Sequence, residues 1–496
     1  MTWCSTNGIE LRDLVPAETR RSWVAAGHCP DRDLYALFLD RVARHPRRTA
    51  VVDERGALDY ASLDAEVRGL AGALHGFGPG DVIGVRVPNG RDAVVAELAV
   101  AAIGAVVLPF GGGLTDAASV LRRTRASALI TDAPAPRGLR HLRDVLPVTA
   151  RGPDRTPSPV DPEAPARILV SSGAEPDLVA YTHNAIAGGR GNHLRAVHGD
   201  TEVWRDLVLV PLSSASGSFG AAVTLCRFGG TVLLMRRFDA AAALRVIATQ
   251  RPTHVFGVPA MLFRMAASAS TVDTSSLRAV VSGGGVLPLP VLRACREVFG
   301  VDVIDVYGSS DGVVCHTTTP EHGVGRPDPA VADVRVVDGE VCALGPVTPL
   351  CHVDAPSPRL PGGWVRTGDR GRFDETGALH VVRRLDRVVV RDGYPISPAE
   401  VERALGAHPG VSEVACVPVP DRELGERLCA CVSPKPGHPA PDLRQLTSFL
   451  ADRQGVTRRE LPEFLLVLAE FPVAHTGKVC LRTLTRLAAE RHGGAR

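Results

Sequence analysis

One lysine stands out, because arginine supplies almost every basic side chain of this sequence. Lysine and arginine together number 56, yet lysine occurs only at Lys435 and Lys478. Lys478 follows a His-Thr-Gly turn near the end of the chain. An ammonium group is a compact point charge that a guanidinium does not mimic. Charge stabilisation is therefore the chemistry that this position suggests, and Lys478 is a candidate functional residue.

Two aspartates stand in segments that could bind a ligand. Asp369 closes a Thr-Gly-Asp turn, and Asp311 follows the strand-like segment that ends in Tyr307-Gly308-Ser309-Ser310. A carboxylate is a hard oxygen ligand that suits Mg²⁺. It can also accept two hydrogen bonds at once. Both carboxylates are therefore candidate ligand-binding groups.

Two glycine-bearing turns follow apolar strand segments. Residues 166–170 lead into Ser171, Ser172 and Gly173, and residues 277–282 lead into Gly283, Gly284 and Gly285. Backbone N–H groups of such a loop can cradle a phosphate. Glycine also lets the backbone approach a ligand closely. The alternatives are an ordinary strand-to-helix turn for the first segment and a tight turn for the second.

The elements that would position these residues alternate between strands and helices. We predict strands near 50–53, 81–87, 105–109, 166–170, 207–211, 231–234, 253–258, 277–282 and 303–307, and helices at 33–44, 62–74, 91–104 and 240–249. This alternation predicts parallel sheets with helices on both faces. Residues 132–165 are rich in proline and arginine and predict a mostly irregular connection with one short element.

Residues 367–400 look like a hinge joined to a binding site. A helix is expected from Pro398, with Ser397 as its cap and Glu400 completing a capping box. Strands near 411–417 and 427–432, a helix at 443–453 and an apolar run at 464–468 follow. The predicted fold class is α/β, with a large N-terminal doubly wound multi-sheet domain and a smaller, mobile α+β C-terminal domain.

The bulk properties exclude several classes of protein. With 496 residues the chain is too long for one core, and its net charge of +2 argues against a nucleic-acid partner. No run of about 18 apolar residues predicts a membrane span, and the first residues do not read as a signal peptide. The 11 cysteines contain no Cys-x-x-Cys pair. Reduced thiols and a cytoplasmic location are therefore expected.

The hinge segment carries a resemblance to a known family. The Thr367-Gly368-Asp369 turn is followed by Arg-Arg-Leu-Asp-Arg and then by Gly-x-x-Ile-Ser-Pro-x-Glu-Val-Glu. This combination resembles the adenylate-forming (AMP-binding) superfamily, which includes the acyl-CoA synthetases, the adenylation domains of peptide synthetases and firefly luciferase. The resemblance extends from about residue 30 to 485. It implies an AMP-binding domain at 1–385, a lid domain at 386–496 and a pivot at Asp386.

The resemblance also implies roles for single residues. The ring of Tyr307 would stack on adenine, Asp369 and Arg384 would bind the ribose, and Asp311 would hold Mg²⁺. Ser310 takes the place of a threonine whose hydroxyl contacts the α-phosphate. Lys478 would enter the active site when the lid closes and stabilise charge as a carboxylate attacks the α-phosphate. Further nucleotide contacts are implied for Ser171, Ser172, Gly173, Gly283, Gly284, Gly285 and Gly308.

Two segments depart from the family pattern. The phosphate loop lacks two residues, and Asp177 stands where the family has a lysine, so its carboxylate would repel a pyrophosphate. The acyl pocket would be walled by Ser214, Ser216, Gly217, Gly283 and Gly308. The serines there replace an aromatic residue and a histidine, and an ordinary serine cap on a helix is the alternative. No aspartate matches the one that binds the α-amino group of an amino-acid substrate.

Together these features predict an ATP-dependent, AMP-forming ligase that activates a small-molecule carboxylic acid, with an aryl or cyclic acid as the first choice. Coenzyme A or the phosphopantetheine of an acyl carrier protein would accept the acyl group, and a role in secondary metabolism is expected. A first alternative is a diazotase that adenylates nitrite for attack by an aryl amine. A second alternative is a catalytically dead nucleotide-binding relative.

Overall fold

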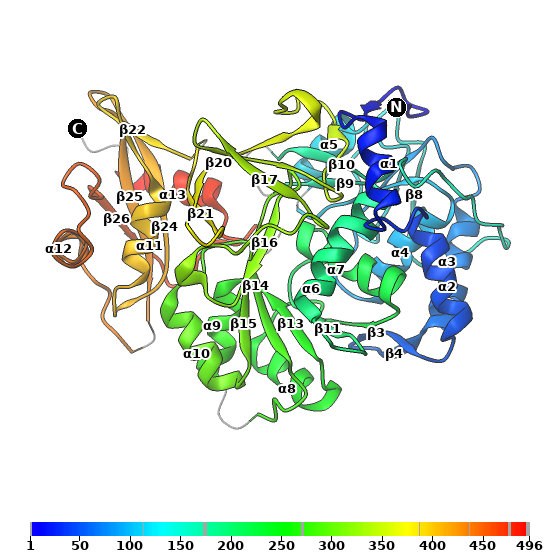
Figure 1. Ribbon diagram of the computed structural model, residues 1–496, viewed down its shortest axis with the longest axis horizontal. Coiled ribbons are helices and arrows are strands. Elements are labelled where there is room, and N and C mark those ends of the chain that lie inside the picture. The colour runs from blue at the N-terminus through cyan, green and yellow to red at the C-terminus, as the bar shows by residue number, and fades with distance from the viewer. Residues whose placement is uncertain are drawn as a thin grey trace.

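The computed structural model describes residues 2–112, 114–171, 176–268, 272–385, 387–435, 437–474 and 478–492. Its strands form a seven-stranded, an eight-stranded, a four-stranded and a five-stranded sheet, together with an N-terminal hairpin of β1 (Thr2–Cys4) and β2 (Glu10–Arg12). Figure 1 shows the two largest sheets side by side and the last sheet set apart from them.

The seven-stranded sheet is parallel in its centre and antiparallel at one edge. Its order is β19 (Cys351–His352), β10 (Leu178–Thr182), β9 (Pro165–Val170), β6 (Val106–Pro109), β5 (Val82–Val85), β7 (Ala128–Ile130) and β8 (Asp144–Leu146). Strand β10 pairs antiparallel with both β9 and β19. The central strands are buried along their whole length, as expected for a sheet that is covered on both faces.

The eight-stranded sheet carries most of the candidate nucleotide-binding residues. Its order is β16 (Val314–Thr317), β15 (Asp302–Gly308), β14 (Ala279–Gly283), β13 (His254–Gly257), β11 (Arg205–Val208), β12 (Thr231–Leu234), β3 (Thr49–Asp53) and β4 (Gly56–Asp59). The six inner strands are parallel, so β14 and β15 end side by side at one edge. Gly283 is the register partner of Val306 there. Ligands bind at such carboxyl ends in open α/β sheets.

Helices pack against these sheets. They are α1 (Ala17–Ala25), α2 (Leu34–Arg44), α3 (Tyr60–Ala73), α4 (Arg91–Ala102), α5 (Leu114–Arg123), α6 (Gly191–His198), α7 (Ala215–Val223), α8 (Ala240–Gln250), α9 (Pro259–Ser268) and α10 (Leu289–Phe299), the π-helices η1 (Ala185–Arg190) and η2 (Thr224–Phe228), and the short 3-10 turns η3 (Pro320–His322) and η4 (Pro361–Gly363). The side chains of Asp33, Asp59 and Asp239 each accept a hydrogen bond from a backbone N–H in the first turn. These caps satisfy donors that a helix start leaves unpaired.

A four-stranded antiparallel sheet connects the large sheets with the C-terminal part. It contains β17 (Asp333–Val337), β18 (Glu340–Leu344), β20 (Val365–Phe373) and β21 (Leu379–Arg384). Strands β20 and β21 form a hairpin in which Asp369 lies opposite Arg384. The fold thereby brings together two residues that the sequence separates by a turn.

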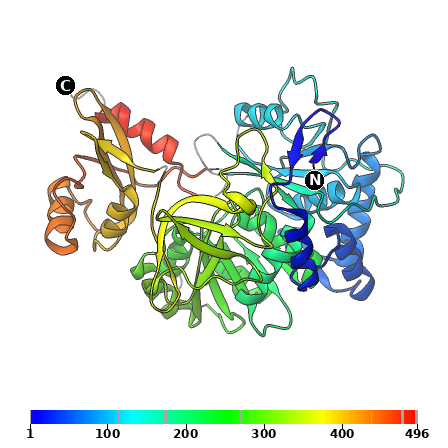
Figure 2. The same cartoon turned by 45° about the horizontal axis from the view of Figure 1, so that its top comes forward.

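The residues from 389 onward have a sheet and cores of their own. The sheet contains β22 (Val389–Arg391), β23 (Tyr394–Ile396), β24 (Val411–Asp421), β25 (Gly425–Pro434) and β26 (Phe464–Val467), and the helices are α11 (Pro398–Gly406), α12 (Leu443–Gln454) and α13 (Leu481–His492). The two buried clusters here draw only on residues of this region. In Figure 2 this part lies beside the rest as a separate body.

The predicted fold class is confirmed, and so are most of the predicted elements. One local expectation is wrong: Ser397 precedes α11, but its hydroxyl makes no capping hydrogen bond and is buried without a partner among the described residues. Pro398 does open the helix. All 11 cysteines are free thiols. No helix within the described ranges is long and apolar enough to cross a membrane.

Candidate active site

Tyr307 and Asp369 meet across two sheets. The phenol of Tyr307, near the end of β15, donates a hydrogen bond of 2.6 Å to Oδ2 of Asp369 on β20. Nη1 of Arg384 lies 3.5 Å from Oδ1 of the same carboxylate. Burial and the neighbouring Asp369 raise the pKa of Tyr307, so the phenol remains protonated and a donor. The sequence had predicted all three residues as parts of one site.

The triple glycine lies at the end of the neighbouring strand. Gly283 ends β14, and Gly284 has a left-handed backbone with φ of 82°. Gly284 and Gly285 are exposed. A Cβ atom on Gly284 would lie 2.8 Å from Cε and 3.6 Å from Nζ of Lys478. The absence of a side chain at Gly284 therefore makes room for the lysine.

Lys478 reaches this edge of the sheet from the C-terminal part of the chain. The backbone N–H of Ala474 donates to the carbonyl of Lys478 at 2.7 Å, and Val473 forms a β-bridge with Val479. The intervening residues, Thr476 and Gly477 among them, lie outside the described ranges. Burial lowers the pKa of Lys478, and the positive charge of Arg384 lowers it further. The cationic side chains of Lys478 and Arg384 are therefore close enough to repel each other, which favours binding of an anionic ligand.

Asp311 has a partner that the sequence did not predict. Nε2 of His352, on strand β19, lies 3.0 Å from Oδ1 of Asp311. The side-chain hydroxyl of Ser309 accepts a hydrogen bond from the backbone N–H of Asp311 at 3.1 Å. The carbonyl of Ser310 accepts one from the phenol of Tyr181 at 2.5 Å. The segment that continues from Tyr307 and Gly308 is therefore fixed by contacts with the seven-stranded sheet.

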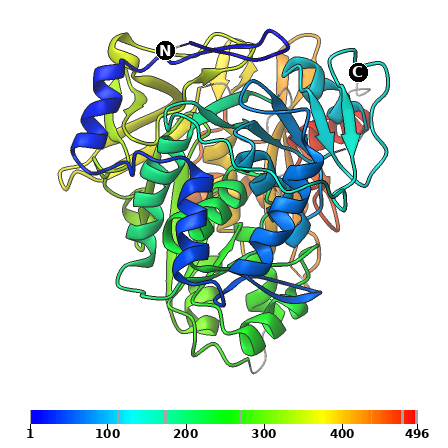
Figure 3. The same ribbon diagram turned by 90° about the vertical axis from the view of Figure 1, so that its right-hand side faces the viewer.

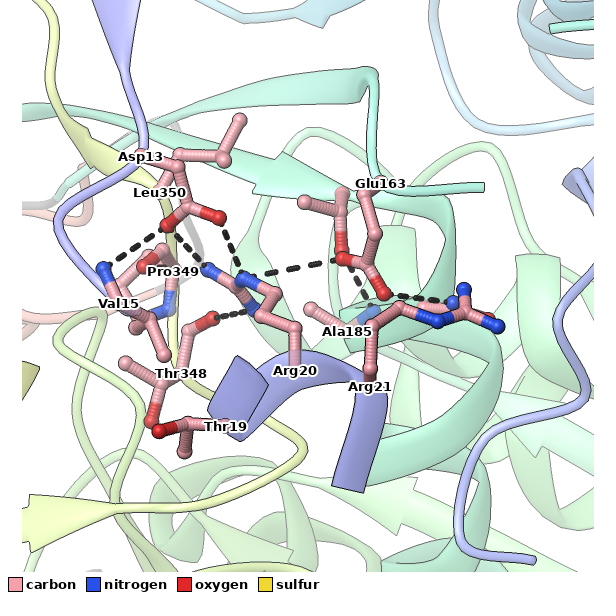
Figure 4. A network of polar contacts seen from close by, with 12 residues as sticks. Asp13, Val15, Thr19, Arg20, Arg21, Glu163, Ala185, Thr348, Pro349 and Leu350 are labelled. Carbon is pink, nitrogen blue, oxygen red and sulfur yellow. Dashed lines mark hydrogen bonds and ion pairs between the residues drawn. The ribbon is translucent and has the colours of Figure 1, made fainter. Parts of the chain in front are cut away.

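The segment just before strand β19 is held by two arginines. Arg20 on α1 is buried, forms a 2.6 Å ion pair with Asp13, and donates to the carbonyls of Thr348 and Pro349. Figure 4 shows this network, together with the ion pair of 3.7 Å between Arg20 and Glu163. Arg359 also donates to the carbonyl of Pro349, at 2.9 Å. In Figure 3 the N-terminal segment, in blue, lies beside the yellow segment that contains residues 348–359.

The shortened phosphate loop is only partly described, since Ser172 and Gly173 lie outside the described ranges. Ser171 closes the turn: its hydroxyl accepts from the backbone N–H of Asp177 at 2.8 Å, and its own N–H donates to the carbonyl of Asp177. Arg123 donates to the carbonyl of Pro176 and forms an ion pair with Asp354. A phosphate contact of Ser171 stays a prediction.

The predicted pocket wall is the start of α7. Ser214 caps this helix: its hydroxyl donates to the carbonyl of Pro211 at 2.7 Å and accepts from the N–H of Gly217 at 3.2 Å. Gly217 is buried, and a Cβ there would lie 2.2 Å from the carbonyl oxygen of Pro211. Ser216 is exposed. Ser214 therefore caps α7, and Gly217 allows this helix to pack closely against Pro211. Contact of either residue with substrate stays a prediction.

Two further polar side chains near the site were missed by sequence reasoning. Asp305 lies on β15 opposite Ser282, its Oδ1 is buried without a hydrogen-bond partner among the described residues, and burial raises its pKa to about 7. Arg190 ends the π-helix η1 and lies near Gly308. Their only sequence signal is a charged residue within an apolar segment. Asp386, the predicted pivot, lies outside the described ranges.

One buried group outside this site has the spacing of a metal centre. It consists of His198, Asp206 and His254. Both ring nitrogens of His198 face acceptors, the carbonyl of Leu194 and Oδ1 of Asp206, each at 2.8 Å. The other carboxylate oxygen of Asp206 accepts from the hydroxyl of Thr224. His198 and Asp206 are therefore satisfied by hydrogen bonds within the chain, which indicates a structural role.

A polar site at the carboxyl end of a parallel sheet, reached by a lysine from the C-terminal part of the chain, is typical of nucleotide-dependent enzymes. Residues 38–349 match the AMP-binding enzyme family, and residues 400–478 match the AMP-binding enzyme C-terminal domain. The chain belongs to this adenylate-forming family and is an enzyme of the acyl-CoA synthetase-like ligase type.

Several relatives span nearly the whole chain. It is 29% identical to salicyl-AMP ligase / salicyl-S-ArCP synthetase of Mycobacterium tuberculosis, over 95% of this chain and 93% of the relative. It is 30% identical to 4-coumarate–CoA ligase-like 5 of Oryza sativa subsp. japonica, over 97% and 96%. Among solved structures, an amide bond synthetase from Marinactinospora thermotolerans is 28% identical with a TM-score of 0.73, over 92% and 99%.

Proposed function

We propose that this protein is an ATP-dependent, AMP-forming ligase that converts a carboxylic acid into an acyl-adenylate and then into a thioester. One observation carries the proposal. The ammonium of Lys478 and the guanidinium of Arg384 lie at the same edge of the sheet as the open turn of Gly284 and the Asp369 carboxylate. Two cations suit a phosphate, and a neighbouring carboxylate suits the hydroxyl groups of a ribose.

The adenosine would lie along the ends of β14 and β15. The ring of Tyr307 offers a flat surface for adenine, and Asp369 would accept hydrogen bonds from the two ribose hydroxyls, with Arg384 beside it. Oδ1 of Asp305, which has no hydrogen-bond partner among the described residues, is a suitable acceptor for the exocyclic amino group of adenine, since a buried carboxylate oxygen without a donor is costly. The exposed backbone of Gly284 and Gly285 leaves room for the ligand.

Asp311 fits a magnesium site that the phosphates complete. Its Oδ1 is held by His352, and its Oδ2 has no hydrogen-bond partner in the described part of the chain. Mg²⁺ commonly takes one or two carboxylates and fills its remaining positions with phosphate oxygens and water. When bound, the ion would neutralise phosphate charge. Asp311 would hold it, and His352 would keep the carboxylate oriented.

The first half-reaction forms one bond and breaks another at the α-phosphorus. A carboxylate oxygen of the acid attacks the α-phosphorus of ATP, and pyrophosphate leaves with the electrons of the broken P–O bond. Lys478 would stabilise the negative charge on the oxygens around phosphorus as this occurs. Tyr307, Asp369 and Arg384 would hold the nucleotide in place, which supports the in-line geometry of attack.

The second half-reaction would transfer the acyl group to sulfur. A thiolate of coenzyme A or of a carrier-bound phosphopantetheine attacks the acyl carbon, and AMP leaves. We propose that residues 1–385 and 386–496 act as separate domains, with Asp386 as the pivot of a rotation that withdraws Lys478 and admits the thiol. We also propose that the reaction takes place in the cytoplasm.

An aryl or cyclic acid is the proposed substrate class. The names of the relatives support it: a salicyl-AMP ligase, a 4-coumarate–CoA ligase-like protein and a 2-hydroxy-7-methoxy-5-methyl-1-naphthoate–CoA ligase are each 29% or 30% identical over nearly the full chain. The sequence has no aspartate at the position that binds an α-amino group in peptide synthetases, which disfavours amino acids.

Pyrophosphate release tests the proposal directly. Wild-type protein with ATP and Mg²⁺ is offered a panel of aryl and cyclic acids, and Lys478→Ala and Lys435→Ala are assayed beside it. Lys435 is the matched control, because it is the other lysine and follows β25 in the C-terminal sheet. Acid-dependent release that is lost in Lys478→Ala and kept in Lys435→Ala supports the ligase. Equal loss in both variants contradicts the role of Lys478.

A second candidate function follows from the altered phosphate loop. Asp177 is exposed where the family carries a lysine, and a carboxylate there repels a pyrophosphate. A diazotase of the same superfamily, which adenylates nitrite for attack by an aryl amine, is the corresponding candidate. Release that depends on nitrite together with an aminoaryl acid would identify it. Measurable ATP binding with no release under any condition would indicate a catalytically dead relative.

A further inference from the structure

The segment after strand β10 is a π-helix, η1, which continues directly into α6. Gly189 packs so closely that a Cβ there would lie 2.2 Å from the backbone nitrogen of Val347. The carbonyls of Ala187 and Gly188 accept hydrogen bonds from Nη1 of Arg227 at 2.5 and 3.0 Å. π-helical turns are rare and frequently occur at functional sites. This one is firmly anchored, and its last residue is Arg190.

Arg190 points toward the predicted acyl pocket. Its Nη1 would lie 3.9 Å from a Cβ on Gly308, and its Nη2 donates to the carbonyl of Ser309 at 3.3 Å. Its Cζ lies 5.0 Å from the centre of the Phe219 ring, on the helix that carries Ser216 and Gly217. Gly308 is exposed and Phe219 is buried. The guanidinium therefore lies between the end of β15 and the first turns of α7.

Arg190 forms no ion pair among the described residues. Within the described ranges no carboxylate lies within 4.0 Å of its guanidinium, and its Nε is buried without a hydrogen-bond partner. The fully buried Arg20 and Arg167 are paired with Asp13 at 2.6 Å and with Glu97 at 2.8 Å, whereas the half-buried Arg227 and Arg359 donate to backbone carbonyls. Arg190 is half-buried, with hydrogen bonds to the carbonyl of Ser309 and to the phenol of Tyr181, so an anion from outside the chain would be a favourable partner for its charge.

We propose that Arg190 binds a second acidic oxygen on the acid substrate, a carboxylate or an ionised hydroxyl placed away from the carboxylate that reacts. This inference rests on the proposed function, because it assigns one end of the acyl pocket. A guanidinium presents several N–H donors in a fork that suits such oxygens. The aromatic ring of Phe219 and the open backbone of Gly308 offer a flat surface for the body of an aryl acid.

The α-phosphate is the other source of an oxyanion near this edge of the sheet. The proposal favours the acid because Lys478 and Arg384 already supply two cations on the nucleotide side. Arg190 instead contacts Phe219 on α7, the helix of the predicted pocket wall. The two sources make different predictions: loss of a phosphate contact weakens AMP binding, whereas loss of a substrate contact changes the preference among acids.

The test uses benzoate and the three benzenedicarboxylates as probes. Wild type, Arg190→Met, Arg190→Lys and Arg195→Gln are compared in pyrophosphate release. Arg195 is the control, because it is exposed on α6 about one turn further along. In Arg190→Met, kcat/KM should fall about 10- to 100-fold for the preferred doubly acidic probe and little for benzoate, as expected for a lost charge-assisted hydrogen bond. Arg190→Lys should restore part of the loss.

Binding measurements separate this inference from the proposed reaction. Thermal shifts with each acid in the presence of AMP, and the Kd for AMP alone, require no turnover and are made in Lys478→Ala as well. The inference holds if doubly acidic probes stabilise wild type and Lys478→Ala more than Arg190→Met, even if no pyrophosphate is released. It is overturned if Arg190→Met weakens AMP itself, or if it leaves the ranking of the acids unchanged.

Discussion

The side chain of Lys478 occupies the place where a side chain on Gly284 would begin. A Cβ atom there would lie 2.8 Å from Cε of the lysine, closer than real contacts allow. Gly284 directly follows β14 of the eight-stranded sheet, whereas Lys478 comes from the C-terminal part of the chain. The contact between these two residues therefore joins the C-terminal part of the chain to the proposed nucleotide site.

Gly284→Ala should impair adenylation without unfolding the protein. The new methyl group would push Lys478 away, and misplacement of a reacting group by about 1 Å can cost about 100-fold in rate. We expect pyrophosphate exchange to fall about 10- to 100-fold. Gly300→Ala is the control, since Gly300 has a similar φ of 65° and open space around it, so it carries the backbone strain alone. Equal rates in the two variants would contradict the contact.

The pH dependence of adenylation should reveal the lowered pKa of Lys478. Because burial and Arg384 lower this pKa from 10.5, the ammonium loses its proton at a lower pH than a free lysine does. The rate should therefore fall as pH rises through that lowered pKa and be fully present below it. In Arg384→Gln one cause is removed, so the alkaline limb should move to higher pH. A limb that stays in place would rule out the coupling.

Asp369→Asn should weaken nucleotide binding through the ribose. Asparagine keeps the shape but replaces one acceptor oxygen with a donor group and removes the charge. A hydrogen bond to a charged group contributes about 1.5–3 kcal/mol, so the Kd for AMP should rise about 10- to 100-fold. Calorimetry with 2′-deoxy-AMP provides the check. Wild type should discriminate against the deoxynucleotide, and the variant should lose this discrimination; unchanged discrimination would remove Asp369 from the ribose site.

His352→Ala should raise the magnesium requirement of the enzyme. The imidazole fixes Oδ1 of Asp311, so its loss leaves the carboxylate free to rotate away from the phosphates. We expect the Mg²⁺ concentration for half-maximal rate to rise about tenfold, within the 10- to 100-fold range typical of lost metal-orienting contacts. Mn²⁺ binding in the presence of ATP, followed by electron paramagnetic resonance, gives a readout apart from turnover. His352→Gln, which keeps a donor, should recover part of the binding.

The His198–Asp206 pair should matter for stability alone. Both residues are buried and their side chains are mutually satisfied. Removing one partner leaves an uncompensated charge, and such changes cost about 3–5 kcal/mol. His198→Ala should therefore lower the denaturation midpoint clearly while leaving the KM for ATP near the wild-type value in protein that remains folded. A changed metal content with unchanged stability would instead favour a metal centre.

The order of the elements could be predicted from sequence because apolar periodicity and turn residues are local signals. The predicted strands that end at Ser282 and Tyr307 are present and adjacent, and the structure brings Tyr307, Asp369, Arg384 and Lys478 to one place as the family pattern implied. Each of these residues belongs to a short motif with its own turn and charged side chain, and such motifs can be found in the sequence without knowledge of distant contacts.

Contacts between distant segments could not be predicted. His352 reaches Asp311 because β19 is added to the edge of the seven-stranded sheet, and Arg190 reaches Gly308 because a π-helix changes the register of its side chains. Neither pairing leaves a periodic signal. The expected capping box at Ser397 failed for a similar reason: the spacing was suitable, but the local backbone does not bring the hydroxyl to a donor.

Arg20 and Arg359 both donate hydrogen bonds to the segment just before β19, so helix α1 supports the strand that carries His352. Arg20 lies ahead of residue 38, where the match to the AMP-binding family begins, yet it holds the carbonyls just before the strand of His352. A chimera or a shortened variant that begins at residue 38 would lack Arg20 and therefore its hydrogen bonds to Thr348 and Pro349. The segment before residue 38 should therefore be exchanged between relatives only together with residues 345–363.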